Sequence, residues 1–314
     1  SSNYPEEKGD LYTCFIEKSR RLLTNGGRSA LVTMHGWMFI GTYEKFREKH
    51  SHSVSIDNLL HLGPHAFKEI SGEKVQVCAF TTSKFIEGQK GCAVDLTNSD
   101  SKQTDFLQKN YHKYEFSVSD LEGLKGIPYS YWVDKYTIDT LSKCDDFTSI
   151  ATSKIGLQTG DNDKFIRNWF EVSYQETKDF RDNDNEHDSK WYFHNKGGEN
   201  VKWFFYPKHV VMWGNDGDAI KSEKARKLSL GLIEKKNSGC WNEEYYLKSG
   251  LSYTRMASGK LMCYSIDSGI MFDTAAPTIF PVKSVSKYAL LGILNSNIIS
   301  ELVKVFNPTL SFQK

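Results

Sequence analysis

The sequence predicts an α/β first part, in which helices alternate with the strands of one sheet, and an α+β second part that is rich in strands. Two observations carry this prediction. Between residues 10 and 81, helically spaced apolar residues alternate with short apolar runs, whereas most aromatic residues, which favour strands, come after residue 110. The clearest break in pattern is a turn, because Gly160 can take a positive φ and the Asp-Asn-Asp run at residues 161–163 can bond back to nearby backbone.

The first part opens with a helix, a turn and a strand. Residues 10–23 place apolar side chains at helical spacing, and Asp10 is positioned to cap the N-terminus. The Asn-Gly-Gly run at residues 25–27 ends the helix, because glycine readily takes the left-handed conformation. Residues 30–34 form an apolar run without alternation. Such a run predicts a strand in a sheet that is covered on both faces.

The pattern then continues as a sheet flanked by helices. The predicted elements are a helix at residues 42–49, strands at 56–62, 75–81 and 92–96, a helix at 101–109 and helical spacing around 135–143. A complete doubly wound nucleotide-binding fold also needs a glycine-bearing first βα turn, followed by an acidic residue for the ribose. We find no such turn in the 314 residues. The predicted sheet therefore lacks its cofactor-binding beginning.

The second part is placed after a boundary near residue 130. Its predicted elements are strands at residues 169–172 and 203–206, a charged loop at 179–188, a basic helix at 219–230 and an amphipathic helix or helix pair at 288–306. The basic helix has two readings, a solvated helical face or a track along phosphates. The sequence does not separate them.

Composition narrows the class of protein. The 40 basic and 39 acidic residues give a net charge of +1, which leaves any binding of nucleic acid to local patches. No apolar run approaches a membrane span and the N-terminus has no signal-peptide pattern, so we expect a cytoplasmic location and no membrane partner. The six cysteines show no C-x-x-C pair and no histidine at ligand spacing, so neither a zinc site nor a disulfide framework is indicated.

Catalytic patterns are missing from the sequence as well. None of the nine histidines falls at the spacing of a metal-binding helix, and no nucleophile–base pair or carboxylate pair stands out. We therefore expect no catalytic, cofactor-binding or metal-binding residues in this chain. Recognition remains as its function.

Five stretches, in order and with compatible spacing, resemble one family. Residues 10–37, with Asp-Leu-Tyr at 10–12 and Leu-Leu-Thr-Asn-Gly-Gly-Arg at 22–28, are similar to the segment that follows the catalytic N-P-P-Y motif of amino-methylating DNA methyltransferases. The other four stretches are residues 155–169, 190–199, 210–217 and 250–260. Together they resemble large adenine-specific DNA methyltransferases of bacteriophage-exclusion (BREX) defence systems and of type IIG restriction-modification enzymes.

The resemblance implies a fold and a division of roles. Residues 1–130 would form the second half of a Rossmann-like methyltransferase sheet, with the strands at 56–62 and 75–81 as its closing reversed hairpin. Residues 131–314 would form an α+β, β-rich domain that recognises double-stranded DNA. The expected partners are this DNA and other proteins of the defence system.

The resemblance also implies the chemistry of the parent enzyme. The parent would use S-adenosylmethionine to methylate N6 of an adenine that is extruded from the duplex. Its cofactor-binding half and N-P-P-Y motif would lie upstream of Ser1, because the runs at residues 3–5 and 307–309 do not match the motif. We expect the fragment alone to bind no cofactor and to be inactive.

For contacts to DNA we choose cations and one tyrosine on or near predicted loops: Lys164, Arg167, Lys196, Lys202, Tyr253, Arg255 and Lys260. Two or three of these are expected only to solvate turns. An alternative from a different class is a non-enzymatic β-rich module that binds carbohydrate or protein through its many aromatic residues. Within the family, the sequence leaves open the target sequence, an upstream nuclease, the type of defence system, the oligomeric state and which cations contact bases.

Overall fold

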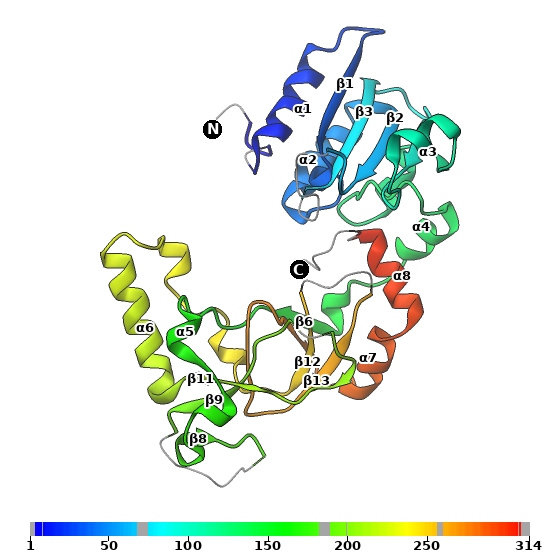
Figure 1. Ribbon diagram of the computed structural model, residues 1–314. Coiled ribbons are helices and arrows are strands. Elements are labelled where there is room, and N and C mark those ends of the chain that lie inside the picture. The colour runs from blue at the N-terminus through cyan, green and yellow to red at the C-terminus, as the bar shows by residue number, and fades with distance from the viewer. Residues whose placement is uncertain are drawn as a thin grey trace. The chain divides into compact units, whose positions relative to one another are not determined.

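The structure, a computed structural model, describes residues 4–7, 9–67, 75–181, 189–198, 200–255, 260–306 and 308. The chain divides into two compact units (Figure 1). One consists of Ser1–Cys144 with Val305–Pro308, and the other of Asp145–Lys304 with Thr309–Lys314. The division falls later than residue 130 because the helix α4 (Lys135–Leu141) buries Ile138 in the core of the first unit.

The first unit is built on one five-stranded sheet in the order β1-β3-β2-β4-β5. Its strands are β1 (Arg28–Met34), β2 (Val54–Gly63), β3 (Val77–Lys84), β4 (Gly91–Asp95) and β5 (His112–Phe116). Strand β3 is antiparallel to both of its neighbours, and β2 runs parallel to β4. The strands predicted at 56–62 and 75–81 are therefore confirmed as an antiparallel pair, but they do not close the sheet, because β4 and β5 continue it beyond β2.

The predicted helices of the first unit are also present. They are α1 (Leu11–Leu22), α2 (Glu44–Ser51), α3 (Lys102–Gln108) and α4, with single 3₁₀ turns η1 (His35–Met38), η2 (Gly41–Tyr43) and η3 (Ser119–Gly123). Helix α1 ends as expected, since Gly26 in the following turn has a φ of 72°.

Trp37 lies at the centre of the first core. Its fully buried ring contacts the rings of Phe46, Phe80 and Tyr129, with centroids 5.0–6.1 Å apart. The buried Arg47 holds the surrounding backbone, because its guanidinium donates hydrogen bonds to the carbonyl oxygens of Trp37, Ile40 and Gly126. Burial lowers the pKa of Arg47 to about 10.

One prediction for this unit is wrong within the described residues. The apolar run at 30–34 predicts a strand covered on both faces, but β1 is an edge strand whose side chains alternate between exposed and half-buried. Val32 is 59% exposed and Met34 39%. The residues described here cover only one of the two faces on which β1 lies.

The second unit contains two sheets. The first has the order β10-β13-β12-β15-β6, and the second has the order β14-β9-β11-β7 with β8 paired to β9. The strands are β6 (Ala151–Lys154), β7 (Ile166–Asn168), β8 (Thr177–Lys178), β9 (Trp191–Asn195), β10 (Trp203–Phe204), β11 (His209–Met212), β12 (Gly250–Tyr253), β13 (Cys263–Ile266), β14 (Met271–Phe272) and β15 (Thr278–Pro281).

Helices cover parts of these sheets. They are α5 (Asn162–Phe165), α6 (Gly214–Ser229), α7 (Lys287–Leu294) and α8 (Asn297–Phe306), with 3₁₀ turns η4 (Phe147–Ser149), η5 (Trp169–Glu171), η6 (Tyr174–Glu176), η7 (Lys235–Asn237) and η8 (Glu243–Tyr245). The basic helix and the C-terminal helix pair are thus confirmed. Among the described residues no single helix has the length and apolar composition to cross a membrane; α7 and α8 reach both only together, with a 71° bend between them.

Two predicted strands of the second unit are corrected. Residues 169–171 form η5, because the Glu171 carboxylate accepts a hydrogen bond from the backbone N–H of Asn168 and closes a helical turn. The strand predicted at 203–206 is reduced to Trp203–Phe204, and within it Trp203 has a φ of 74°, which is unusual for a strand. Most of the charged loop predicted at 179–188 lies outside the described residues.

Three buried histidines make the first unit sensitive to acid. His35 Nδ1 lies 2.8 Å from His61 Nε2, and His50 Nδ1 lies 3.1 Å from the Tyr129 hydroxyl. Burial lowers the pKa of His35 to about 3, helped by the neighbouring His61, and it lowers the pKa of His50 and of His61 to about 4. These rings are neutral in the folded protein at neutral pH.

Replacing His50 by glutamine should flatten the pH dependence of stability. A histidine that is neutral when folded gains its proton on unfolding, so the unfolding free energy falls as the pH drops from about 6.5 towards the folded pKa of about 4. The expected loss of slope in His50→Gln is about 1.4 kcal/mol per pH unit in this window, measured by urea unfolding. His112→Gln is the control, because the His112 side chain is exposed on β5 of the same unit, and this variant should keep the slope of the wild type.

Candidate nucleic-acid interface

Residues 273–276, Asp-Thr-Ala-Ala, form a turn on which three other segments of the second unit meet. We call it the Asp273 turn. The N–H of Asp273 donates to the carbonyl oxygen of Asn195 at 3.0 Å, and the N–H of Arg255 donates to that of Ala275 at 3.0 Å. On the other side, the N–H of Thr274 donates to the carbonyl oxygen of Leu157 at 3.3 Å. Residues 156–163, 195–198, 254–255 and 273–276 therefore form one continuous structure, which we call the rim.

The Asp273 carboxylate holds the turn in shape. Its Oδ1 accepts hydrogen bonds from the N–H of Ala275 at 2.8 Å and from the Thr274 hydroxyl at 3.0 Å, and its Oδ2 lies 3.4 Å from Nε2 of the buried His194. Burial acts to raise the pKa of Asp273, but the hydrogen bond from His194 and the N–H of Ala275 together bring it below its usual value. The carboxylate is therefore committed to structure.

A second buried network lies beneath the turn. Asn195 donates from Nδ2 to the Ser252 hydroxyl at 2.9 Å and accepts from the Tyr264 hydroxyl at 3.2 Å. The Ser252 hydroxyl in turn faces the carbonyl oxygens of Ala276 and Pro277, both at 3.1 Å. Since buried polar groups without partners are costly, this network ties the turn to β9, β12 and β13.

An open cleft of about 540 Å³ lies between the turn and residues 158–163. Polar side chains line it, among them Gln158, Asn162, Asp163 and Thr274. With Asp161 and Asp273 also present, the lining carries three carboxylates. This surface repels phosphates but offers acceptors to hydrogen-bond donors.

Helix α6 supports the loop that forms one wall of the cleft. Lys227 Nζ donates to the carbonyl oxygen of Gly160 at 3.1 Å, and Lys164 Nζ lies 3.1 Å from Glu223 Oε2. Lys224 is buried and donates to the carbonyl oxygen of Gly239 at 2.7 Å. The helix predicted to be basic is thus largely engaged within the unit.

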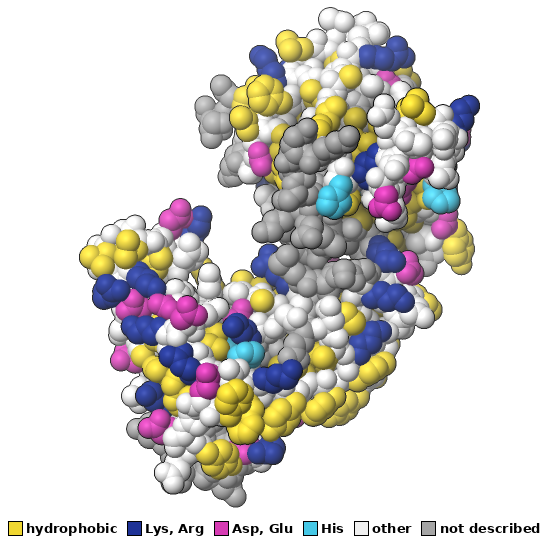
Figure 2. Space-filling view, viewed as in Figure 1, with side chains coloured by type: hydrophobic (Ala, Val, Ile, Leu, Met, Phe, Trp, Pro, Cys, Tyr) yellow, Lys and Arg dark blue, Asp and Glu magenta, His cyan; other side chains and the backbone are white. Residues whose placement is uncertain are grey.

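The remaining cations of α6 are also paired with groups of the second unit. Lys221 pairs with Asp216 and Glu243, and Arg226 pairs with Glu223. Figure 2 shows basic and acidic side chains mixed over α6 instead of a basic stripe. These ion pairs favour the reading of α6 as a solvated helical face over its reading as a track along phosphates.

The seven residues predicted to contact DNA fall into several places. Lys196 and Arg255 both adjoin Ala275, because Gly197 packs against Ala275 and the Arg255 N–H donates to it. Lys164 lies on α5, next to the cleft, whereas Lys202 Nζ lies 3.4 Å from the carbonyl oxygen of Asn295, after α7.

The other three predicted contacts are less uniform. Arg167 Nη1 donates to the carbonyl oxygens of Asp163 and Ile166, so its guanidinium supports its own chain segment. Lys260 is exposed and follows residues 256–259, which lie outside the described residues. The prediction that Tyr253 contacts DNA is corrected. Its side chain on β12 is 7% exposed, and burial raises the pKa of its phenol. Its hydroxyl lies 3.4 Å from Ser153 Oγ. It belongs to the core and not to a DNA-facing surface.

Sequence reasoning missed the residues that build the rim. Asp273, His194 and Asn195 are separated along the chain and carry no spacing motif. The Asp-Thr-Ala-Ala-Pro run at 273–277 does contain a turn signal, since aspartate bonds to the backbone two residues on. The described residues contain no group of three potential metal ligands, and the six cysteines are all unpaired.

Comparison with known proteins decides the family. Residues 1–67 match the family model of the Eco57I restriction-modification methylase. The adenine-specific methyltransferase PglX of Lacticaseibacillus casei (strain Zhang) is 31% identical over 322 residues, which cover 99% of this chain and 26% of PglX. The adenine-specific methyltransferase BrxX of Escherichia coli O9:H4 (strain HS) is 28% identical over 315 residues, which cover 98% of this chain and 25% of BrxX.

The chain is a homologue, over almost its whole length, of the adenine-specific methyltransferases PglX and BrxX. The resemblance seen in the sequence is confirmed. The chain spans about a quarter of the length of these methyltransferase relatives. It also shares a fold with the type IIL restriction-modification enzyme MmeI, solved in complex with DNA, with a TM-score of 0.61 over 97% of this chain and 40% of MmeI at 10% identity.

In this methyltransferase segment, Gly197→Ala should disturb the rim more than Gly198→Ala. Both glycines have a positive φ, 74° and 91°, so an added Cβ strains the backbone at either position. A Cβ on Gly197 would also lie 2.8 Å from the carbonyl oxygen of Ala275, whereas a Cβ on Gly198 meets no atom within 4 Å. We expect Gly197→Ala to reduce the unfolding free energy by about 1–2 kcal/mol more than Gly198→Ala, measured by urea denaturation. Equal losses would contradict the described packing of Gly197 on the turn.

Proposed function

We propose that this chain contributes DNA target recognition, and a segment of the catalytic sheet, to a site-specific DNA adenine-N6 methyltransferase of a phage-defence or restriction-modification system. The observation that carries the proposal is the alignment of almost the whole chain with two adenine-specific methyltransferases. The fold shared with MmeI supports it. The enzyme would act in the cytoplasm, on the DNA there.

The rim offers chemistry that suits this role. Arg255 and Lys196 lie near Ala275, where a guanidinium can bind guanine O6 and N7 or a phosphate, and an ammonium can bind a phosphate. Gln158 and Asp163 in the cleft carry acceptors for the exocyclic amino groups of adenine and cytosine. Cations would fix the position on the duplex and the cleft would read base edges. Lys164 and Lys260 complete the proposed contact set, with Lys202 and Arg167 in supporting positions.

The methyl donor, S-adenosylmethionine, is assigned to the parent enzyme in this proposal. In support of this assignment, the turn after β1 is closed, because Gly36 is buried against the side chains of Tyr12 and Ile40. A bound cofactor needs an open glycine turn at the end of a strand, with an acidic residue for its ribose. This chain would therefore act through binding, and the reaction would need the rest of the enzyme.

Calorimetry should detect no stoichiometric micromolar site for S-adenosylmethionine on residues 1–314. The reason is the closed turn after β1. A saturable heat signal with one site per chain would contradict the assignment of the cofactor to other parts of the enzyme. S-adenosylhomocysteine serves as a second ligand with the same nucleoside, and it should also give no signal.

Arg255→Ala should weaken binding to duplex DNA by about tenfold, because loss of one good contact to a base edge costs about 1–3 kcal/mol. The measurement is fluorescence anisotropy at several salt concentrations, with duplexes that the wild type has selected from a random pool. A contact to a phosphate would instead reduce the slope of log K against log salt by about one. Lys283→Ala, at an exposed position after β15, is the matched control and should leave affinity unchanged.

Two outcomes distinguish a failure of the Arg255 prediction from a failure of the proposed function. Unchanged affinity of Arg255→Ala at every salt concentration would remove Arg255 from the contact set. Absence of salt-dependent DNA binding by the wild type would contradict the proposed function itself. Salt-insensitive binding to glycans or to a protein would then favour the alternative, a non-enzymatic β-rich module that binds carbohydrate or protein.

A further inference from the structure

A strained turn lies at β10, the edge strand of one sheet of the second unit. The N–H of Phe204 donates to the carbonyl oxygen of Lys202 at 2.9 Å, and Trp203 between them has a φ of 74°. A hydrogen bond that closes three residues around a positive φ defines a γ-turn of the rare, strained kind. Bulky aromatic residues are disfavoured at such a φ. Backbone strain of this kind is concentrated at binding and active sites.

The turn leaves two neighbouring aromatic side chains in solvent. Trp203 is 53% exposed and Phe204 67%. Successive side chains of a regular strand point to opposite faces, so one of the two would ordinarily face the core. Here the next residue, Phe205, packs inwards instead, with its ring centroid 5.0 Å from that of Tyr264. The exposed pair is therefore held on an anchored ring, although both the strain and the apolar exposure cost free energy.

The exposed pair lies near the rim. In the register of the sheet Trp203 is opposite Tyr264, and Tyr264 is opposite Ser252. Neighbouring strands lie about 4.8 Å apart, so the backbone of Trp203 is about 10 Å from that of Ser252. The Ser252 hydroxyl contacts the carbonyl oxygen of Ala276 in the Asp273 turn. A distance of about 10 Å corresponds to about three nucleotides of one DNA strand, so a strand on the rim can reach Trp203.

The chain around the exposed pair is basic. Residues 196–208 contain three lysines and one glutamate, which gives this stretch a net charge of +2. Lys202 is the first residue of the γ-turn itself. Each nucleotide brings a phosphate together with its base, whereas a neutral glycan or an apolar peptide brings no negative charge. Aromatic rings with cations beside them therefore fit nucleotides better than either alternative.

We propose that Trp203, with Phe204 beside it, is a stacking platform for a DNA base that has left the helical stack. The inference rests on the proposed function, because it takes DNA as the ligand, and it adds that the DNA is bound with a base unstacked. Trp203 contributes affinity for the deformed duplex and no preference for one base, since every base has a face that can stack. Lys202 lies where it can bind the adjoining phosphate.

Two duplexes with the same number of phosphates test the proposal. One carries a single unpaired adenine, and the other carries an abasic residue at the same position. The wild type should bind the first about tenfold more tightly, because the second has no base to stack. Trp203→Ala and Trp203→Leu should bind both duplexes equally, whereas Trp203→Phe should keep part of the preference. Fluorescence anisotropy with residues 1–314 at several salt concentrations gives the affinities.

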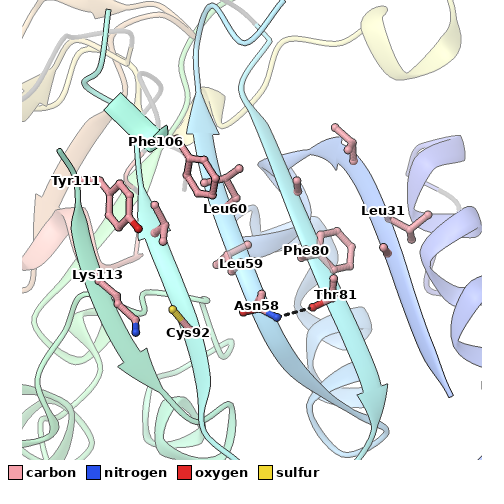
Figure 3. Close-up of a pocket in the computed structure, with 14 residues that line it drawn as sticks. Leu31, Asn58, Leu59, Leu60, Phe80, Thr81, Cys92, Phe106, Tyr111 and Lys113 are labelled. Carbon is pink, nitrogen blue, oxygen red and sulfur yellow. Dashed lines mark hydrogen bonds between the residues drawn. The ribbon is translucent and has the colours of Figure 1, made fainter. Parts of the chain in front are cut away.

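Two controls accompany these variants. Affinity for the abasic duplex reports on folding, because the cations of the second unit are unchanged in all three variants, and Trp203→Leu also keeps an apolar side chain in the turn. Phe106→Ala is the control for loss of an exposed aromatic ring. Phe106 is 44% exposed in the first unit, but its ring is already stacked on that of Tyr111, with centroids 5.8 Å apart (Figure 3). This variant should keep the tenfold preference.

The outcomes distinguish the stacking role from the proposed function. Equal binding of the two duplexes by the wild type, at an affinity that falls with salt, would overturn the stacking role and leave the proposed function in place. A preference that persists in Trp203→Ala and Trp203→Leu would also overturn it. Absence of salt-dependent binding to either duplex would contradict the proposed function, and the stacking role with it.

Discussion

The backbone hydrogen bonds of the Asp273 turn are the constraint on which the second unit depends. The turn joins β14 of one sheet to β15 of the other, so its peptide groups must find partners outside either sheet. Buried peptide groups that lack partners cost free energy, and here neighbouring segments provide them: Asn195 and Leu157 accept, and Arg255 donates. The arrangement of the cleft walls follows from these backbone hydrogen bonds. The Asp273 carboxylate and the Asn195 amide then fix the turn in one conformation.

In the first unit, the charged side chain of Arg47 provides hydrogen-bond partners for backbone carbonyl groups. A fully buried guanidinium is costly unless each N–H finds an acceptor, and Arg47 meets three carbonyl oxygens that lie near η1, η2 and the loop before Tyr129. These loops contain no regular ladder of their own. Arg47 therefore takes the place of secondary structure around Trp37, and the aromatic cluster packs on a backbone that one side chain organises.

Local pattern was enough to predict the helices other than α5 and the strands β1 to β4, whereas most strands of the second unit were not predicted. Helical spacing identified α1, α6 and the α7–α8 pair, and apolar runs identified β2 and β3, because period and composition act over a few residues. The failures have local causes as well. Glu171 closes a helical turn that no propensity reveals, and Trp203 takes a left-handed conformation that aromatic residues rarely adopt.

The candidate site was predicted less completely, for a different reason. Tyr253 lies in the core because β12, paired on both sides, is buried along its whole length, and long-range pairing alone brings Lys196 and Arg255 to the same turn. Cations were visible in the sequence, but their intramolecular partners were not. Glu223, which engages Lys164 and Arg226, lies far from the first of them along the chain.

The way in which the Asp273 turn is held has an evolutionary consequence. Its partners at Leu157, Asn195 and Arg255 contribute main-chain groups, which nearly every residue type possesses. The side chains at positions such as 158, 196 and 255 are therefore not required for the frame that displays them. Mutation can exchange them one at a time while the frame persists, so, under the proposed function, a lineage of such proteins could change its DNA target through folded intermediates. Substitution is constrained at Asp273, Asn195 and Gly197, because their own atoms form the frame.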